Sequence, residues 1–178
     1  FKAKSKPGAR LYCHGHKAGA AILIEPGIDI DTKAEKIAWD TMMWDQQGCM
    51  SPQTIYAVGA RDEELDHLAR KLCSQLSLLR QSHPRCELSA NESAAIIAAR
   101  SQFSVSDQTL SITQSPNSTD WTVAVHRSVA FPPNPLFRFI NLIKVPNFDE
   151  LLAHLKTTSV PFSTFGVDVS LSVSLDQN

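Results

Sequence analysis

Apolar positions recur with two different periods along this chain, and the two periods alternate. Continuous or β-branched apolar runs predict strands, whereas leucines at three- and four-residue steps predict helices. The predicted strands cover residues 18–24, 54–58, 110–113, 121–126, 138–145 and 164–175. The predicted helices cover residues 31–48, a long segment from 62, about 91–100 and a short segment from 147. Strands that alternate with helices in this way indicate an α/β fold, with a largely parallel sheet covered by helices.

Local signals predict the ends of two of these elements. Asp31 and Thr32 offer an N-cap for the first helix, and Glu35, three residues after Thr32, completes a capping box. Gly48 suits the left-handed position that often ends a helix. The segment 164–175 alternates apolar with polar residues, so we expect a strand with one polar face at the edge of the sheet.

Composition indicates one globular domain. The 178 residues are 43% hydrophobic and 20% charged, which is ordinary for a folded domain. The formal net charge of -1 gives no support for strong binding to nucleic acid or to anionic membranes. No apolar run of the sequence is long enough to span a membrane, and no secretory signal precedes the four cysteines. We therefore expect free thiols and a cytoplasmic protein.

Cys49 is the strongest candidate for chemistry. It follows Gly48 at a predicted helix-to-strand junction, in the segment Asp45-Gln-Gln-Gly-Cys-Met-Ser-Pro52. A thiol held by backbone turns in a loop is available as a nucleophile. A helical turn near residues 51–52 would favour its thiolate, whereas a nearby Asp45 carboxylate would disfavour it. An ordinary structural cysteine is the simpler alternative.

Histidines offer further candidates. Cys13, His14 and His16 lie close in sequence, with His83 and Cys86 as a distant second pair. Because no close Cys-x-x-Cys pair accompanies them, we predict no metal site. Neutral imidazole titrates near working pH, so His14 and His16 are candidate proton donors, with a surface position as the simpler alternative.

A Cys–His hydrolase is a second possible reaction class. His126 lies in a predicted strand, and His67 and His154 lie on predicted helices. Any of the three that met Cys49 in space would form a pair able to hydrolyse a thioester without nicotinamide. The sequence alone identifies no such pair.

The segment around Cys49 resembles a known catalytic motif. Residues 40–53, Asp-Thr-Met-Met-Trp-Asp-Gln-Gln-Gly-Cys-Met-Ser-Pro-Gln, look like the catalytic-cysteine segment of the fatty acyl-CoA reductases of bacterial bioluminescence (LuxC type). That family is a branch of the aldehyde dehydrogenase superfamily. Upstream, Gly15-His16-Lys17 resembles the Glu-Leu-Gly-Gly-Lys segment that opens aldehyde dehydrogenase catalytic domains. Residues 138–155 and 164–169 resemble the strand, helix and returning strand near the end of that domain.

This resemblance implies an aldehyde-dehydrogenase-like catalytic domain that spans residues 1–178. Cys49 would attack a long-chain acyl-CoA, or take the acyl group from a partner protein, and its backbone N–H would stabilise the oxyanion. Hydride from NADPH would then release a fatty aldehyde from the acyl-cysteine. Members of the superfamily usually assemble through strand exchange, so a homo-oligomer is expected. A role in luminescence does not follow, because the chemistry is separable from any luciferase.

Two departures from the family pattern are informative. With Lys17 on the family lysine, Cys13 stands where hydrolytic aldehyde dehydrogenases carry the glutamate that activates water. The missing carboxylate is consistent with reduction of the acyl-thioester rather than hydrolysis. Pro133-Asn134-Pro135 replaces the Glu-x-Phe-Gly-Pro pattern that touches the nicotinamide ribose, so no cofactor contact is carried over.

The cofactor-binding domain is expected to lie outside this chain. The sequence holds no Gly-x-Gly-x-x-Gly phosphate cradle, and it starts at Phe1 rather than at a methionine. We therefore expect an isolated catalytic domain that binds NADPH poorly by itself. A non-catalytic interaction domain of the same fold is the main rival, and it predicts an unreactive thiol at Cys49. Trp39 and Trp44, on the helix before Cys49, are candidates to wall an acyl tunnel, and core packing explains them equally well.

Overall fold

The computed structural model describes residues 17–24, 29–127 and 129–167. Within these residues six strands form one sheet in the order β3-β4-β5-β2-β1-β6. Every neighbouring pair is parallel except β3 and β4. The strands are β1 (Ala18–Ile24), β2 (Pro52–Val58), β3 (Thr109–Gln114), β4 (Thr122–His126), β5 (Phe139–Val145) and β6 (Phe162–Val167). This confirms the predicted α/β fold with a largely parallel sheet.

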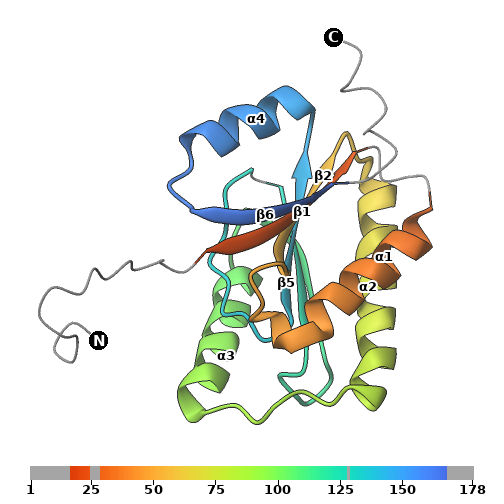
Figure 1. The fold of residues 1–178 in the computed structure, drawn as a ribbon, viewed down its shortest axis with the longest axis vertical. Helices are drawn as coiled ribbons and strands as arrows, with labels where there is room; N and C mark the ends of the chain where they lie inside the picture. The colour runs from red at the N-terminus through yellow and green to blue at the C-terminus, as the bar shows by residue number, and fades with distance from the viewer. Residues whose placement is uncertain (1–16, 25–28, 128, 168–178) are drawn as a thin grey trace, which may run out of the picture.

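Helices cover both faces of the sheet (Figure 1). They are α1 (Ile30–Met42), the short 3-10 helix η2 (Met43–Gln46), α2 (Asp62–Ser82), α3 (Ala90–Ser104) and α4 (Phe148–Thr157). Helices α1 and α2 pack on one face, in a core that includes Ile55 and Leu142 of the sheet. Helix α4 covers Tyr56 on the other face, and α3 covers Phe139 there. The sheet is therefore the middle of three layers, as its wholly buried strand β2 requires.

The leucine stripe of the long helix is confirmed as core. Leu65, Leu68, Leu72 and Leu76 of α2 are all buried, and they pack against α1 and the sheet. Their spacing places one apolar face toward the sheet and leaves the other to solvent.

The predicted bounds of the first helix were wrong. Helix α1 begins at Ile30, after a left-handed Asp29 that makes no side-chain cap, so no capping box forms at Thr32 and Glu35. Asp31 lies inside the helix, where its carboxylate accepts a hydrogen bond from Lys71 of α2 at 2.8 Å. The helix ends at Met42 because the next turn has a different backbone, described below.

Strand β6 confirms the prediction of an edge strand. It pairs only with β1 among the described strands, and it begins at Phe162, two residues before the predicted start. The last eight residues of the predicted strand, 168–175, lie outside the described residues.

Candidate active site at the amino edge of the sheet

Cys49 lies in the loop between η2 and β2, at the edge of the sheet where the parallel strands begin (Figure 1). Its side chain is exposed. It lines a hollow of about 350 Å³ together with Asp40, Met43, Trp44, Gly48, Met50 and Ser51. Trp44 and Met50 are 79% and 73% exposed, so apolar side chains stand beside the thiol with little covering them. The Cys49 thiol is thus accessible from solvent at this edge, with apolar side chains beside it.

The backbone of the Cys49 loop is fixed by neighbouring strand ends. The Ser51 N–H donates to the Gly48 carbonyl at 3.1 Å, which closes a tight turn around Cys49. The Ser163 hydroxyl of β6 donates to the Cys49 carbonyl at 2.7 Å. On β1, the backbone of Gly19 passes so close that a Cβ there would stand 2.5 Å from the Ser51 carbonyl oxygen. Only glycine permits this close approach of β1 to the loop.

An unusual backbone turn leads into the loop. Trp44, Asp45 and Gln46 have positive φ angles of 55°, 51° and 65°. Residues other than glycine adopt this conformation at a cost, so contacts elsewhere must hold it. Gly48 does not supply the left-handed turn that its sequence position suggests, since the positive φ angles fall at residues 44–46.

Gln46 supplies one of those contacts. It is fully buried, and its side-chain amide donates to the carbonyls of Pro52 and Phe139, both at 2.8 Å. Its side-chain carbonyl accepts a hydrogen bond from the Phe139 N–H, also at 2.8 Å. Gln46 therefore joins the Cys49 loop to the first residues of β2 and β5.

Asp45 supplies the second contact. Its carboxylate lies 2.6 Å from the guanidinium of Arg138, whose side chain is only 3% exposed, and it accepts the Cys86 N–H at 3.0 Å. Burial alone would raise the pKa of Asp45, but the Cys86 N–H and the Arg138 guanidinium outweigh burial and hold that pKa below its usual value. The Asp45 carboxylate is thus neutralised by Arg138.

No helical turn forms near residues 51–52, so the first of the two possible effects on the Cys49 thiolate does not apply. Pro52 is already the first residue of β2, so no helix N-terminus points its N–H groups at Cys49. Gln46 binds the Pro52 carbonyl and holds this segment extended, in register with Gly19 of β1.

The other described cysteines are less suited to act as nucleophiles. Burial raises the pKa of Cys73 to about 11. A hydrogen bond to the Asp45 carboxylate, together with some burial, raises the pKa of Cys86. Cys13, His14 and His16 lie outside the described residues, so the two predicted proton donors remain predictions.

The described histidines make their hydrogen bonds away from Cys49. Their partners are Asp31 for His67, Ser82 for His83, Asn141 for His126 and Tyr56 for His154. His126 is buried at the carboxyl end of β4, the opposite edge of the sheet from Cys49, and burial lowers its pKa. These geometries give no support to the Cys–His hydrolase interpretation.

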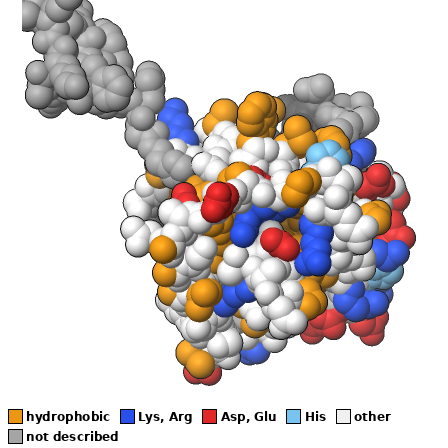
Figure 2. Space-filling model, turned by 90° about the horizontal axis from the view of Figure 1, so that it is seen from below, with side chains coloured by type: hydrophobic (Ala, Val, Ile, Leu, Met, Phe, Trp, Pro, Cys, Tyr) orange, Lys and Arg blue, Asp and Glu red, His pale blue; other side chains and the backbone are white. Residues whose placement is uncertain are grey.

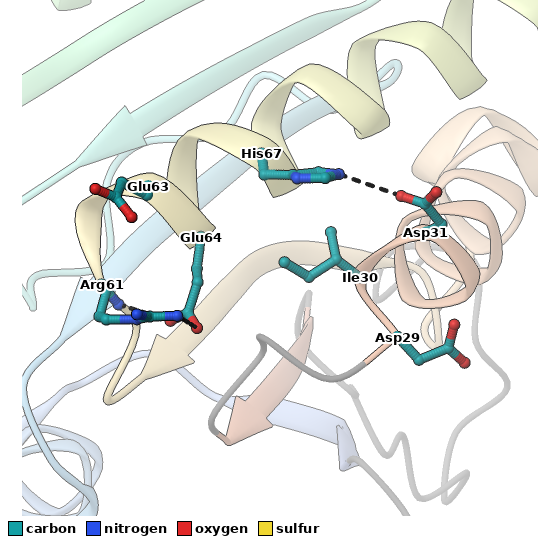
Figure 3. A pocket seen from close by; sticks show the side chains of 7 residues that line it. All are labelled: Asp29, Ile30, Asp31, Arg61, Glu63, Glu64 and His67. Carbon is teal, nitrogen blue, oxygen red and sulfur yellow. Dashed lines mark hydrogen bonds and ion pairs between the residues drawn. The ribbon is translucent and has the colours of Figure 1, made fainter.

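A second hollow lies at the carboxyl edge of the sheet, between the first turns of α1 and α2 (Figure 3). Its volume is about 490 Å³. On its walls Asp31 pairs with His67 and Arg61 pairs with Glu64, and Lys71 of α2 also reaches Asp31. Open α/β sheets often bind ligands at this edge, but with Asp29 and Glu63 this lining carries more acidic than basic side chains.

The described residues also limit the metal and membrane interpretations. They include no group of three His, Cys, Asp or Glu side chains that could hold a metal ion. Among the helices described, none is both long and apolar enough to span a bilayer.

The loop around Asn134 stands where the family pattern has its nicotinamide contact. The Asn134 side-chain amide donates to the Gln53 and Phe139 carbonyls, both at 2.8 Å. Asn134 therefore ties this loop to the same strand ends as Gln46.

Comparison with solved structures places the fold among aldehyde dehydrogenases. An aldehyde dehydrogenase from Brucella melitensis biovar abortus 2308 has a TM-score of 0.64 and 11% identity, covering 88% of this chain and 35% of that one. The gamma-glutamyl-gamma-aminobutyraldehyde dehydrogenase of Burkholderia cenocepacia J2315 has a TM-score of 0.62 and 12% identity, and the match covers 85% of this chain and 38% of that one. A 1-pyrroline-5-carboxylate dehydrogenase from Thermus, solved with bound NAD, has a TM-score of 0.55 and 13% identity, and the match covers 85% of this chain and 31% of that one. The chain thus spans about a third of the length of these enzymes.

The family comparison is more specific than the fold. A search of curated proteins finds no match to the sequence. The family model described as acyl-CoA reductase (LuxC) matches residues 1–172, nearly the whole chain. With the exposed Cys49 at the amino edge of an aldehyde-dehydrogenase-like sheet, this match shows that the chain belongs to the LuxC acyl-CoA reductase family.

Proposed function

We propose that this chain is the cysteine-bearing catalytic domain of an NADPH-dependent reductase that converts long-chain acyl-CoA to fatty aldehyde. One observation carries the proposal: Cys49 is exposed in an apolar-walled hollow, on a loop that β1, β5 and β6 all hold in place. Because the chain spans about a third of its structural relatives, we propose that the cofactor-binding domain lies in sequence beyond it.

The proposed first step is acyl transfer to Cys49. The thiolate of Cys49 attacks the thioester carbon, a new carbon–sulfur bond forms, and the bond to the CoA sulfur breaks. CoA leaves as its thiolate, which takes up a proton. The backbone N–H of Cys49 is proposed to donate to the oxyanion of the tetrahedral intermediate. An acyl-carrying partner protein would react in the same way, because it presents the same thioester.

The second step releases the aldehyde. Bound NADPH would supply a hydride to the acyl carbon. The carbon–sulfur bond to Cys49 then breaks, the thiolate is restored and the aldehyde leaves. His14 and His16 remain the proposed proton donors.

The walls of the hollow favour a long hydrocarbon chain as substrate. Met43, Trp44 and Met50 are apolar, and all three are exposed beside Cys49. Each methylene group that they cover would contribute about 0.8 kcal/mol to binding. A short or charged acyl group gains nothing comparable from these side chains.

Assembly is proposed to use the edge of β6 that pairs with no other described strand. Phe165 and Val167 on this strand are 38% and 49% exposed, so a second copy that packed here would cover apolar surface. We expect the full-length protein to be at least a dimer, measured by size-exclusion chromatography with light scattering. A monomer across the accessible concentration range would contradict this expectation.

Intact-mass spectrometry tests the acyl transfer directly. After incubation with tetradecanoyl-CoA, the chain should gain one acyl group, lose it on treatment with hydroxylamine, and carry it on the peptide that contains Cys49. A matched Cys86→Ser variant should gain the same mass, because Cys86 is exposed but hydrogen-bonded to Asp45. An adduct located on Cys86 would contradict the proposal. Absence of any adduct on the full-length protein would support the non-catalytic interaction domain instead.

A further inference from the structure

Four arginines gather at the same edge of the sheet as Cys49. Arg80 lies in the last turn of α2, Arg85 lies in the loop between α2 and α3, Arg100 lies on α3 and Arg138 directly precedes β5. The view onto this edge shows basic side chains on several sides of an acidic one near the middle of the face (Figure 2). We call these four residues the amino-edge arginine cluster.

Two members of the cluster are compensated by carboxylates. Arg138 pairs with Asp45 at 2.6 Å, and Arg80 pairs with Asp120 at 3.3 Å. Asp120 also accepts a hydrogen bond from the Ser118 hydroxyl at 3.0 Å. Both carboxylates are thus already engaged.

The other two members bond only to neutral oxygens of the turn between β3 and β4. Arg85 donates to the carbonyl and the hydroxyl of Thr119. Arg100 donates to the Ser118 and Trp121 carbonyls at 2.8 and 2.9 Å and to the Thr122 hydroxyl at 2.8 Å. Such bonds satisfy N–H groups but cancel no charge, so four arginines face the two carboxylates of Asp45 and Asp120, and Asp120 also attracts Arg100 and Arg138.

The positive charge of Arg85 affects the pKa values of its neighbours in the cluster. Burial lowers the pKa of Arg100, and the neighbouring charge of Arg85 lowers it further. Burial and the charge of Arg85 act in the same direction on the pKa of Arg138. The Nε of Arg85 and the Nε and Nη1 of Arg138 are buried without a hydrogen-bond partner. Repelling cations with unused donors are the arrangement that an anion stabilises.

We propose that the amino-edge arginine cluster binds the phosphate groups of a nucleotide-bearing substrate, with Arg85 and Arg100 as the direct ligands. The guanidinium fork suits phosphate oxygens, and both side chains are only partly buried, so a ligand can reach them. Asp45, which pairs with Arg138, lies four residues before Cys49, so the cluster adjoins the segment that leads into the Cys49 loop. That the phosphate belongs to CoA or to NADPH rests on the proposed function; the anion site itself does not.

Isothermal titration of the full chain tests this site without any acyl chemistry. The probes are CoA, dephospho-CoA, NADPH, NADH and inorganic pyrophosphate, none of which carries an acyl group. CoA binding more tightly than dephospho-CoA would assign the site to the substrate, and NADPH binding more tightly than NADH would assign it to the cofactor. Affinity should fall as salt rises, because the attraction is electrostatic.

Three variants separate a ligand-binding role from a structural one. Arg85→Gln should weaken binding of the preferred probe about tenfold, and Arg85→Lys should weaken it less, because lysine keeps the charge but lacks the guanidinium fork. Asp120→Asn should strengthen binding several-fold, since it frees the charge of Arg80 while keeping an acceptor for Ser118. Arg61→Gln, at the opposite edge, is the matched control and should leave affinity unchanged.

Two results would overturn the proposal. One is that no probe binds to the folded chain; the other is that Arg85→Gln and Asp120→Asn change affinity in the same direction, as a structural role would predict. Because CoA binding and Cys49 acylation are measured separately, loss of one with retention of the other shows which proposal has failed.

Discussion

Replacing Cys49 by serine should lower the rate of CoA release from a long-chain acyl-CoA by about a thousandfold or more. A thiol forms its thiolate near neutral pH, whereas a serine hydroxyl needs an adjacent base. The described histidines make their hydrogen bonds elsewhere, so none is placed to activate a serine at this position. The measurement is the pre-steady-state release of CoA, followed with a thiol reagent or by mass spectrometry.

The fold should be unaffected by this change. Cys49 is exposed, and its loop is held through backbone groups and through Gln46, so the free energy of unfolding should change by less than about 0.5 kcal/mol. Cys73→Ser, at the partly buried cysteine of α2, provides a control for general effects of losing a cysteine. Acylation that persists in the Cys49→Ser variant would remove Cys49 from the mechanism.

Replacing Arg138 by methionine should cost about 3–5 kcal/mol of the free energy of unfolding. The ion pair with Asp45 is buried, so the substitution leaves an uncompensated carboxylate in a site of low polarity. The same carboxylate belongs to the left-handed turn before Cys49, and the loop should therefore loosen together with the fold. Urea denaturation at pH 7 measures the loss.

The pH dependence identifies Asp45 as the cause. In the native protein the pKa of Asp45 is lowered, so its stabilising contribution is present above the unfolded pKa and is lost as pH falls through the folded pKa. Without Arg138, that pKa is higher than in the native protein, because only the Cys86 hydrogen bonds then oppose the effect of burial, and protonation removes the unpaired charge. The difference in stability between the two proteins should therefore shrink from pH 7 to pH 4, and an Asp45→Leu/Arg138→Met double variant should recover part of it. A difference that is below about 1 kcal/mol at pH 7 would contradict a structural role for the pair.

Much of the fold was predictable because its signals are local. The leucine steps of α2 and the β-branched run of β2 each place their own side chains in the core. The end of α1 was not predictable in this way. Its left-handed turn is held by Gln46, which bonds to Phe139, and by Asp45, which bonds to Arg138; both partners lie more than 90 residues later in the chain.

The candidate site likewise has a part that local sequence signals indicate and a part that depends on distant residues. Cys49 could be proposed from its immediate neighbours, because Gly48 and Pro52 signal a loop on either side of it. Gly19 carried a weaker signal, since a glycine inside an apolar strand often marks close approach of another backbone. Nothing near Ser163 indicated that its hydroxyl would hold the Cys49 carbonyl, because that contact depends on the order of the strands in the sheet.

The hydrogen bond from Ser163 to the Cys49 carbonyl has a consequence for biosynthesis. The two residues are 114 positions apart, and the Gln46 bond to Phe139 spans 93. Cys49 emerges from the ribosome long before the residues that hold its loop, and contacts over such separations form late in folding. The Cys49 loop of the nascent chain should therefore lack these contacts until β6 has been synthesised, so that a polypeptide truncated in its last third would carry the thiol on an unanchored loop.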